Sequence, residues 1–172
     1  MKVCRLKSTD RRRAAATQRL ENRCPDEPIC GAIELDSHAD TCVLGKNFIV
    51  LHYTGRECDV VPFTDQYDAV SGVAIVSGAT AYTDQETGET FVLVINEALN
   101  MPNAMDDTLI NPNQLRAFGT TVQDNPYSGA PLYISDPDEN VIIPLTSKGT
   151  IILAETRTPT EHALSSVYYF TQ

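Results

Sequence analysis

The sequence is poor in metal-binding residues and in apolar runs that could cross a membrane. It contains three histidines and five cysteines, and their spacing, without a C-x-x-C pair, predicts no zinc site. An odd number of cysteines without a regular framework fits free thiols in a reducing compartment. No apolar run approaches the roughly 20 residues of a membrane span, and the Arg-rich start lacks the apolar core of a signal peptide. We therefore expect an intracellular, cytoplasmic protein with no cofactor, no metal and no membrane contact.

Basic residues are few and are concentrated at one end. The chain has 13 Lys and Arg against 23 Asp and Glu, a net charge of -10. Residues 1–23 hold eight of the basic and two of the acidic residues, or +6, which leaves five against 21, or -16, for the remainder. Such an acidic body is unsuited to gripping a phosphate backbone. Nucleic-acid contact is therefore expected, if at all, only through the basic N-terminal arm, which could equally be a solvated helix.

The length of 172 residues suits a single domain with extensions. Residues 11–21 are rich in alanine and predict a short helix, which Pro25 and Pro28 would end. We place a basic arm or linker at residues 1–28, the domain at residues 29–155 and a tail at residues 156–172. No internal repeat is evident.

Beyond residue 31 the pattern is one of short strands and turns, with one short helical turn expected at residues 114–118. The clearest feature is a hairpin whose turn spans residues 84–89. This pattern predicts an all-β closed barrel or sandwich. The expected strands are residues 32–35, 42–44, 48–53, 58–63, 73–76, 79–83, 90–95, 108–110, 131–134, 141–145 and 149–153.

The most informative stretch is residues 33–44, where an apolar strand delivers Asp36 into a Ser37-His38-Ala39 turn. Aspartates hydrolyse peptide bonds in pairs, because two close carboxylates share one proton and so act as base and acid together. The chain has one such turn, and Asp106-Asp107-Thr108 lacks the small residues that would make a second. A C2 homodimer, with one Asp36 from each subunit, is the economical solution.

Residues 35–44 resemble the active-site segment of retropepsin-like aspartic proteases, with its pattern hydrophobic-Asp-Ser/Thr-Gly-Ala. Residues 109–115 resemble the second motif of the family, and the spacing is typical of the protease region of Ty1/copia-type retrotransposon polyproteins. The resemblance covers about residues 32–160. It implies a closed acid-protease barrel in which Asp36 is the catalytic aspartate and Ser37 braces the active-site loop that continues through His38 and Ala39.

The same resemblance implies a homodimer that cuts its own polyprotein, inside the cell and within virus-like particles. It places a flexible flap within residues 64–76. Two positions depart from the pattern, because His38 and Asn111 stand where the family has glycine. The principal alternative is therefore an inactive retropepsin fold that dimerises or binds peptides.

Three other interpretations compete at the Asp36 turn. An Asp-Ser pair in a turn often makes only an Asx-turn, in which the carboxylate accepts a backbone N–H two residues on. Cys42 with His38 would suggest a thiol nucleophile and its base, although a buried apolar role fits Cys42 better. Asp36, His38 and Asp40 would offer three metal ligands without a fourth.

Overall fold

The computed structural model describes residues 2–5, 27–61, 66, 68–136, 138 and 141–165, and these residues are mostly in strands. Only two short helices are found among them, so the all-β class is confirmed. The expected helix at residues 11–21 lies outside the described residues. The strands are β1 (Lys2–Arg5), β2 (Cys30–Leu35), β3 (Val43–Leu44), β4 (Ile49–Val60), β5 (Val70–Thr83), β6 (Thr90–Asn100), β7 (Thr108–Ile110), β8 (Thr121–Gln123), β9 (Tyr133–Asp136), β10 (Val141–Pro144), β11 (Thr146–Lys148) and β12 (Ile151–Arg157), and the helices are α1 (Pro112–Ala117) and α2 (Glu161–Ser165).

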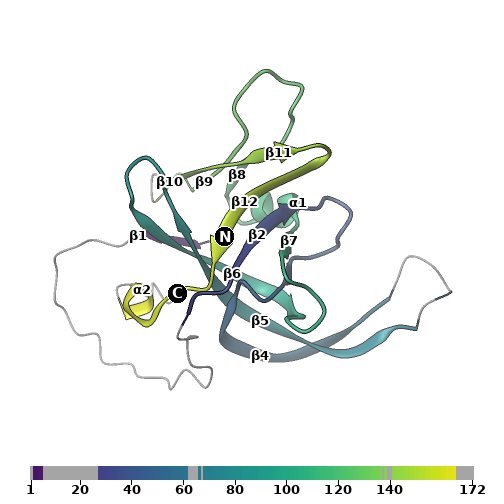
Figure 1. The fold of residues 1–172 in the computed structure, drawn as a ribbon. Helices are drawn as coiled ribbons and strands as arrows, with labels where there is room; N and C mark the ends of the chain where they lie inside the picture. The colour runs from purple at the N-terminus through teal and green to yellow at the C-terminus, as the bar shows by residue number, and fades with distance from the viewer. Residues whose placement is uncertain are drawn as a thin grey trace.

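The strands form a nine-stranded sheet and a three-stranded sheet (Figure 1). The larger sheet has the order β1-β6-β3-β7-β2-β12-β5-β4, with β11 paired to β12, and the smaller has the order β10-β9-β8. The path of the larger sheet turns back on itself, because β5 pairs with β6 as well as with β12. β12 and β5 are paired only at Arg157 and Ala81. Closure of the sheet into a barrel therefore stays a prediction.

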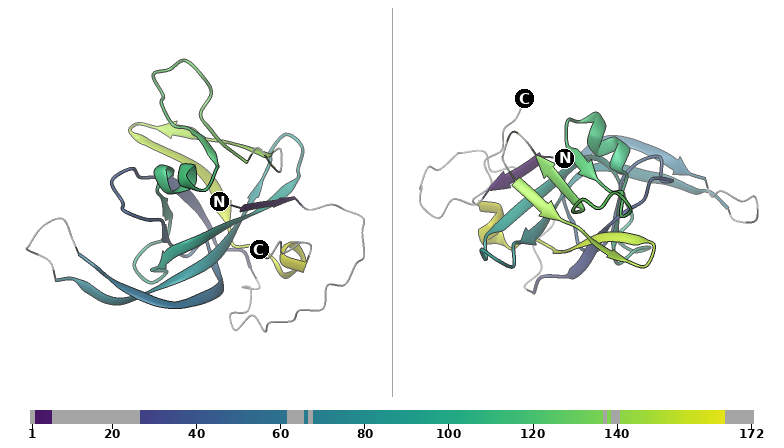
Figure 2. Two further views of the ribbon diagram at one scale, coloured as in Figure 1. Left: turned by 180° about the vertical axis from the view of Figure 1, so that it is seen from behind. Right: turned by 90° about the horizontal axis from the view of Figure 1, so that it is seen from above.

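The β4–β5 hairpin is the longest feature and extends away from the rest of the molecule (Figures 1 and 2). Two strands were expected at residues 48–53 and 58–63, but the structure joins them through residue 60 with a register shift between Tyr53 and Glu57. Gly55 has a φ of 76° there, a conformation that glycine adopts readily, so the predicted break is a bulge. In the expected flap region, residues 70–76 belong to β5 and residues 64, 65 and 67 lie outside the described part, so the flap stays a prediction.

The β5–β6 hairpin confirms the turn predicted at residues 84–89. Asp84 and Glu89 close it with a backbone bond from N to O of 2.8 Å. The Asp84 carboxylate accepts the N–H groups of Glu86 and Thr87, and Gly88 supplies the positive φ. β6 continues to residue 100, beyond the expected end at residue 95, because its later part pairs with both β5 and β3.

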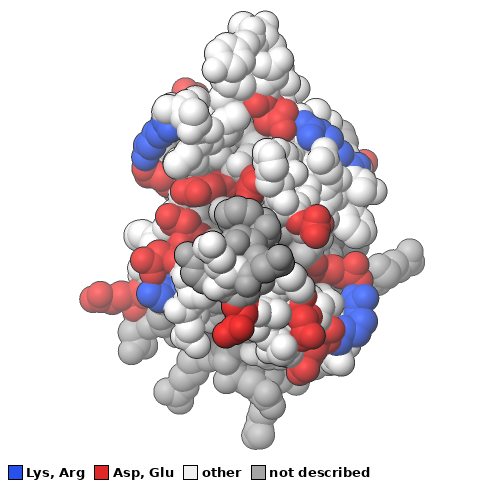
Figure 3. Space-filling model, turned by 90° about the vertical axis from the view of Figure 1, so that its right-hand side faces the viewer, with Lys and Arg blue, Asp and Glu red and all other residues white. Residues whose placement is uncertain are grey.

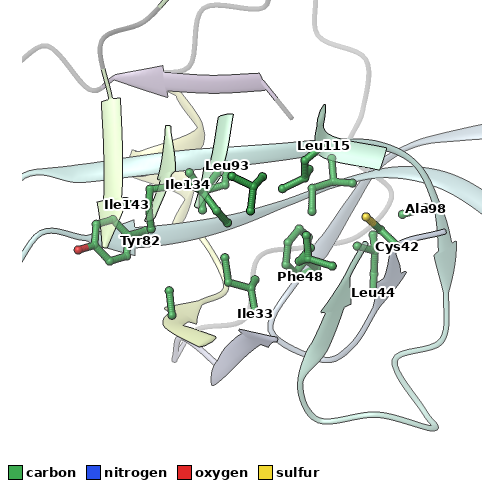
Figure 4. Packing of buried hydrophobic residues seen from close by; sticks show 14 of the residues in the cluster. Ile33, Cys42, Leu44, Phe48, Tyr82, Leu93, Ala98, Leu115, Ile134 and Ile143 are labelled. Atoms are coloured by element: carbon green, nitrogen blue, oxygen red, sulfur yellow. The ribbon is translucent and has the colours of Figure 1, made fainter. Parts of the chain in front are cut away.

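One hydrophobic core joins both sheets. It includes Ile33 of β2, Leu93 of β6, Leu115 of α1 and the pair Ile134 and Ile143 of the smaller sheet, all at most 1% exposed (Figure 4). Burial of each such side chain contributes roughly 1.5–3 kcal/mol. The smaller sheet is therefore part of the same domain, and its strand β8 contacts α1.

Of the two expected domain boundaries, the one between residues 155 and 156 falls inside β12, whereas the one between residues 28 and 29 lies just before β2. β1 pairs antiparallel with β6, from Lys2 opposite Val94 to Arg5 opposite Phe91, so the start of the arm joins the main sheet. At the other end β12 runs through residue 157 and pairs with β2, although the tail was expected to begin at residue 156. α2 then buries Ala163 and Leu164 against β4, β5 and β6. The domain thus extends to residue 165.

Candidate active site around Asp36

Asp36 lies directly after β2, at the point where two parallel strands end together. β2 and β7 pair in parallel, with Leu35 opposite Ile110, and the Asp36 N–H donates to the Ile110 carbonyl at 2.9 Å. The chain then turns through residues 37–41 and returns as β3, which pairs with β6 and β7. This loop and the β4–β5 hairpin extend on the same side of the molecule (Figures 1 and 2). The pairing of β2 with β7 before the loop, and of β3 with β6 and β7 after it, fixes both ends of the surface loop that contains Asp36.

Asp36 is half-buried as a residue, and its carboxylate accepts the N–H of His38 at 2.9 Å. This is the bond that an ordinary Asx-turn makes, so the turn alone does not distinguish the two interpretations. Ser37 and His38 are exposed, whereas Ala39 is half-buried. The loop therefore presents the Asp36 and Asp40 carboxylates, the Ser37 hydroxyl and the His38 imidazole toward the surface.

Asn111 accounts for one of the two departures from the glycine pattern. Its φ of -77° is ordinary for any residue, so the backbone does not demand glycine. Its Oδ1 accepts the N–H groups of Asn113 at 2.8 Å and Gln114 at 3.0 Å and so caps α1. Its Nδ2 donates to the Ala39 carbonyl in the Asp36 loop. The asparagine thus joins the helix to the loop, which a glycine could not do.

Gln114 makes a second connection that the sequence did not reveal. Its Oε1 accepts the Cys42 N–H at 2.7 Å and the Thr41 hydroxyl at 3.0 Å. Its Nε2 lies 3.3 Å from the carbonyl oxygens of Asn96 and Glu97 in β6. Glu97 has a φ of 58°, unusual for a residue other than glycine, near the point where β6 shifts register against β5. In the sequence Gln114 lies in the predicted helical turn and in the segment 109–115 that resembles the second motif, but neither feature gave it a role.

Cys42 is fully buried in the core beside Leu44 and Ala98 (Figure 4). Burial raises the pKa of its thiol above the ordinary value, against a smaller opposing effect of the Asn111 backbone N–H bonded to it at 3.4 Å. The neutral thiol is neither a nucleophile nor a good metal ligand. The structure therefore supports an apolar role for Cys42 and speaks against thiol catalysis with the exposed His38.

Asp106 and Asp107 lie at the opposite end of the strand pair from Asp36. Asp107 precedes β7 and accepts the N–H of Ala32, near the start of β2, at 2.6 Å. Because β2 and β7 run in parallel, these acids are separated from Asp36 by the length of the strands. Neither aspartate can complete an acid pair with Asp36 in the same chain.

The face of the molecule shown in Figure 3 carries more acidic than basic side chains. Four of the basic side chains in the described part form ion pairs with acidic ones: Lys46–Asp106, Arg56–Glu97, Arg116–Asp124 and Lys148–Glu155. Within the described part of the chain, no three His, Cys, Asp or Glu side chains gather closely enough to hold a metal ion. The described helices also include none long and apolar enough to cross a membrane.

Comparison with known proteins gave no match: no family model, no curated protein and no solved structure is significantly similar to the chain. The function is therefore inferred from the residues of the Asp36 loop and their geometry.

Proposed function

We propose that the chain is an aspartic endopeptidase of a retrotransposon polyprotein, active as a homodimer. A water molecule held between the two Asp36 carboxylates of the dimer attacks the peptide carbonyl. One carboxylate takes the proton of the water while the other donates a proton, so no covalent intermediate forms. The chemistry requires no metal or other cofactor, and the substrate is an extended segment of the polyprotein, cut inside the cell within virus-like particles.

The observation that carries this proposal is the position of Asp36 after paired parallel strands, with its carboxylate partly exposed in a loop held by Asn111 and Gln114. A lone Asx-turn needs no such support from a second segment about 70 residues away in sequence. The separation of Asp107 from Asp36 supports the dimer, because the second carboxylate must then come from another copy. In this proposal the curved larger sheet is a closed retropepsin-like barrel.

His38 supports a second candidate function. Its side chain is exposed next to Asp36, where the family has no side chain at all. Two such imidazoles at a dimer axis would fill space that the water and the substrate need. The same fold would then serve as an inactive module for dimerisation or peptide binding, and His38→Gly would be expected to create activity.

Cleavage of a longer precursor tests the choice between these functions. We expect the wild-type precursor to be cut and Asp36→Asn to reduce the rate by about 10²–10⁴-fold or more, the contribution of a positioned acid or base. The rate is measured by following precursor and product with mass spectrometry.

The matched control for this test is Asp106→Asn. It makes the same chemical change at an exposed ion pair, which contributes at most about 1 kcal/mol. The control precursor should be cut at the wild-type rate. Equal cleavage of the Asp36→Asn and wild-type precursors would refute the assignment of Asp36, and an uncut but dimeric wild-type chain would favour the binding module.

A further inference from the structure

The side chain of Gln114 connects the end of the loop that carries Asp36 to β6. Its amide makes contacts on both sides: the oxygen accepts from Cys42 and Thr41 in the loop, and the nitrogen faces two carbonyls of β6. The Thr41 hydroxyl also lies 3.2 Å from the Glu97 carbonyl. We call this set, Gln114 with Thr41, Cys42 and Glu97, the Gln114 bridge.

The bridge acts at the C-terminal end of the loop, while backbone bonding fixes its N-terminal end. Asp36 is anchored by its N–H to the Ile110 carbonyl, and the middle of the loop by Asn111. Residues 37–41 have no strand pairing of their own. Without Gln114 the N–H of Cys42 would lose its acceptor in a place where the Cys42 side chain is fully buried, and an unmet buried donor is costly.

We propose that Gln114 is a positioning residue for Asp36. It does not touch the reacting atoms; it fixes the end of the loop so that the two carboxylates of the dimer meet at the distance that sharing a proton requires. Small errors in the placement of reacting groups cost large factors in rate. This inference rests on the proposed function. The effect of Gln114 on the loop can nevertheless be measured by hydrogen exchange, which does not require the protein to cleave a substrate.

Two variants separate the two sides of the bridge. Gln114→Ala removes the bonds to the loop and the bonds to β6. We expect the hydrogen-exchange protection of the Cys42 amide to fall about tenfold, because one buried hydrogen bond is lost. The protection of the Leu93 amide in the core serves as the reference. In the cleavage assay the kcat of Gln114→Ala should fall while its KM stays near the wild-type value, because positioning acts on the chemical step. Gln114→Glu keeps the acceptor oxygen and loses the two donors, so Cys42 protection should be retained.

The matched control is Gln123→Ala in β8. The amide of Gln123 donates to the Ser128 hydroxyl at 3.1 Å, away from the Asp36 loop. This variant should leave both Cys42 exchange and kcat unchanged.

Each outcome has a distinct meaning. Unchanged Cys42 protection in Gln114→Ala, or an equal fall at Cys42 and Leu93, would overturn the proposal, since the second pattern shows only a loss of global stability. A cleaving enzyme whose kcat is unaffected by Gln114→Ala would also overturn it. A wild-type chain that never cleaves refutes the proposed function, yet a selective fall in Cys42 protection would still establish that Gln114 orders the loop.

Discussion

An equal mixture of wild-type and Asp36→Asn chains is expected to retain about one quarter of the cleavage rate of the same total amount of wild-type protein. Random pairing puts about a quarter of the dimers in the fully wild-type form, and only these contain two carboxylates. A dimer with one asparagine lacks either the base or the acid, so it contributes almost nothing. The rate is measured on a separate peptide substrate after the chains have exchanged partners.

If the site is not shared between two chains, the mixture should retain a different fraction of the wild-type cleavage rate. If each chain cut by itself, the same mixture would retain about one half of the rate, because every wild-type chain would stay active. A mixture with Asp106→Asn chains is the control, and it should keep the full rate because Asp106 lies at the far end of β7 in an exposed ion pair. A retained rate of one half would contradict the dimeric site.

Asn47→Ala is expected to destabilise the fold strongly, because Asn47 joins three strands. Asn47 lies in the segment that connects β3 to β4 and is fully buried. Its Nδ2 donates to the Ala32 carbonyl and the Thr156 hydroxyl, both at 2.9 Å, and its Oδ1 accepts from the Thr108 hydroxyl at 2.8 Å. Alanine would remove these three buried bonds to β2, β12 and β7, and the Thr108 hydroxyl would lose the acceptor of its proton. We expect a loss of roughly 3 kcal/mol in the free energy of unfolding.

Such a loss is a large part of the roughly 5–15 kcal/mol that usually separates the folded and unfolded states. In a domain of this size it lowers the melting temperature by about 6 °C or more. Denaturant titration and calorimetry measure both quantities. Asn103→Ala, at an exposed turn position, is the control and should change stability by at most about 0.5 kcal/mol. A loss below about 1 kcal/mol for Asn47→Ala would show that the network relaxes around the gap.

The features predictable from the sequence were those whose cause is local. The turn after β5 was predicted because Asp84 and Gly88 supply turn chemistry within a few residues. The break expected near Gly55 was wrong for a related reason, since the same turn residues also suit a bulge when β5 lies alongside. Local signals locate an irregularity but do not say whether the strand continues past it.

The support of the candidate site was not predictable, because it depends on residues far apart in sequence. Asp36 could be found from the turn that contains it. Gln114 and Cys42 are 72 positions apart, and Asn47 and Thr156 are 109 apart. Nothing near Gln114 or Asn47 in sequence identifies these partners, which tertiary packing brings together. The same packing explains why Asn111 takes a place where the resembling family has glycine.

Native mass spectrometry with a statine-type peptide, which mimics the tetrahedral transition state, tests the shared Asp36 site most directly. We predict one species of two chains with one inhibitor molecule, which is lost in Asp36→Asn and kept in Asp106→Asn. Because the inhibitor hydroxyl takes the place of the water between both carboxylates, a single molecule should occupy the whole dimer. A complex of one chain with one inhibitor, or equal binding by Asp36→Asn, would contradict the shared site.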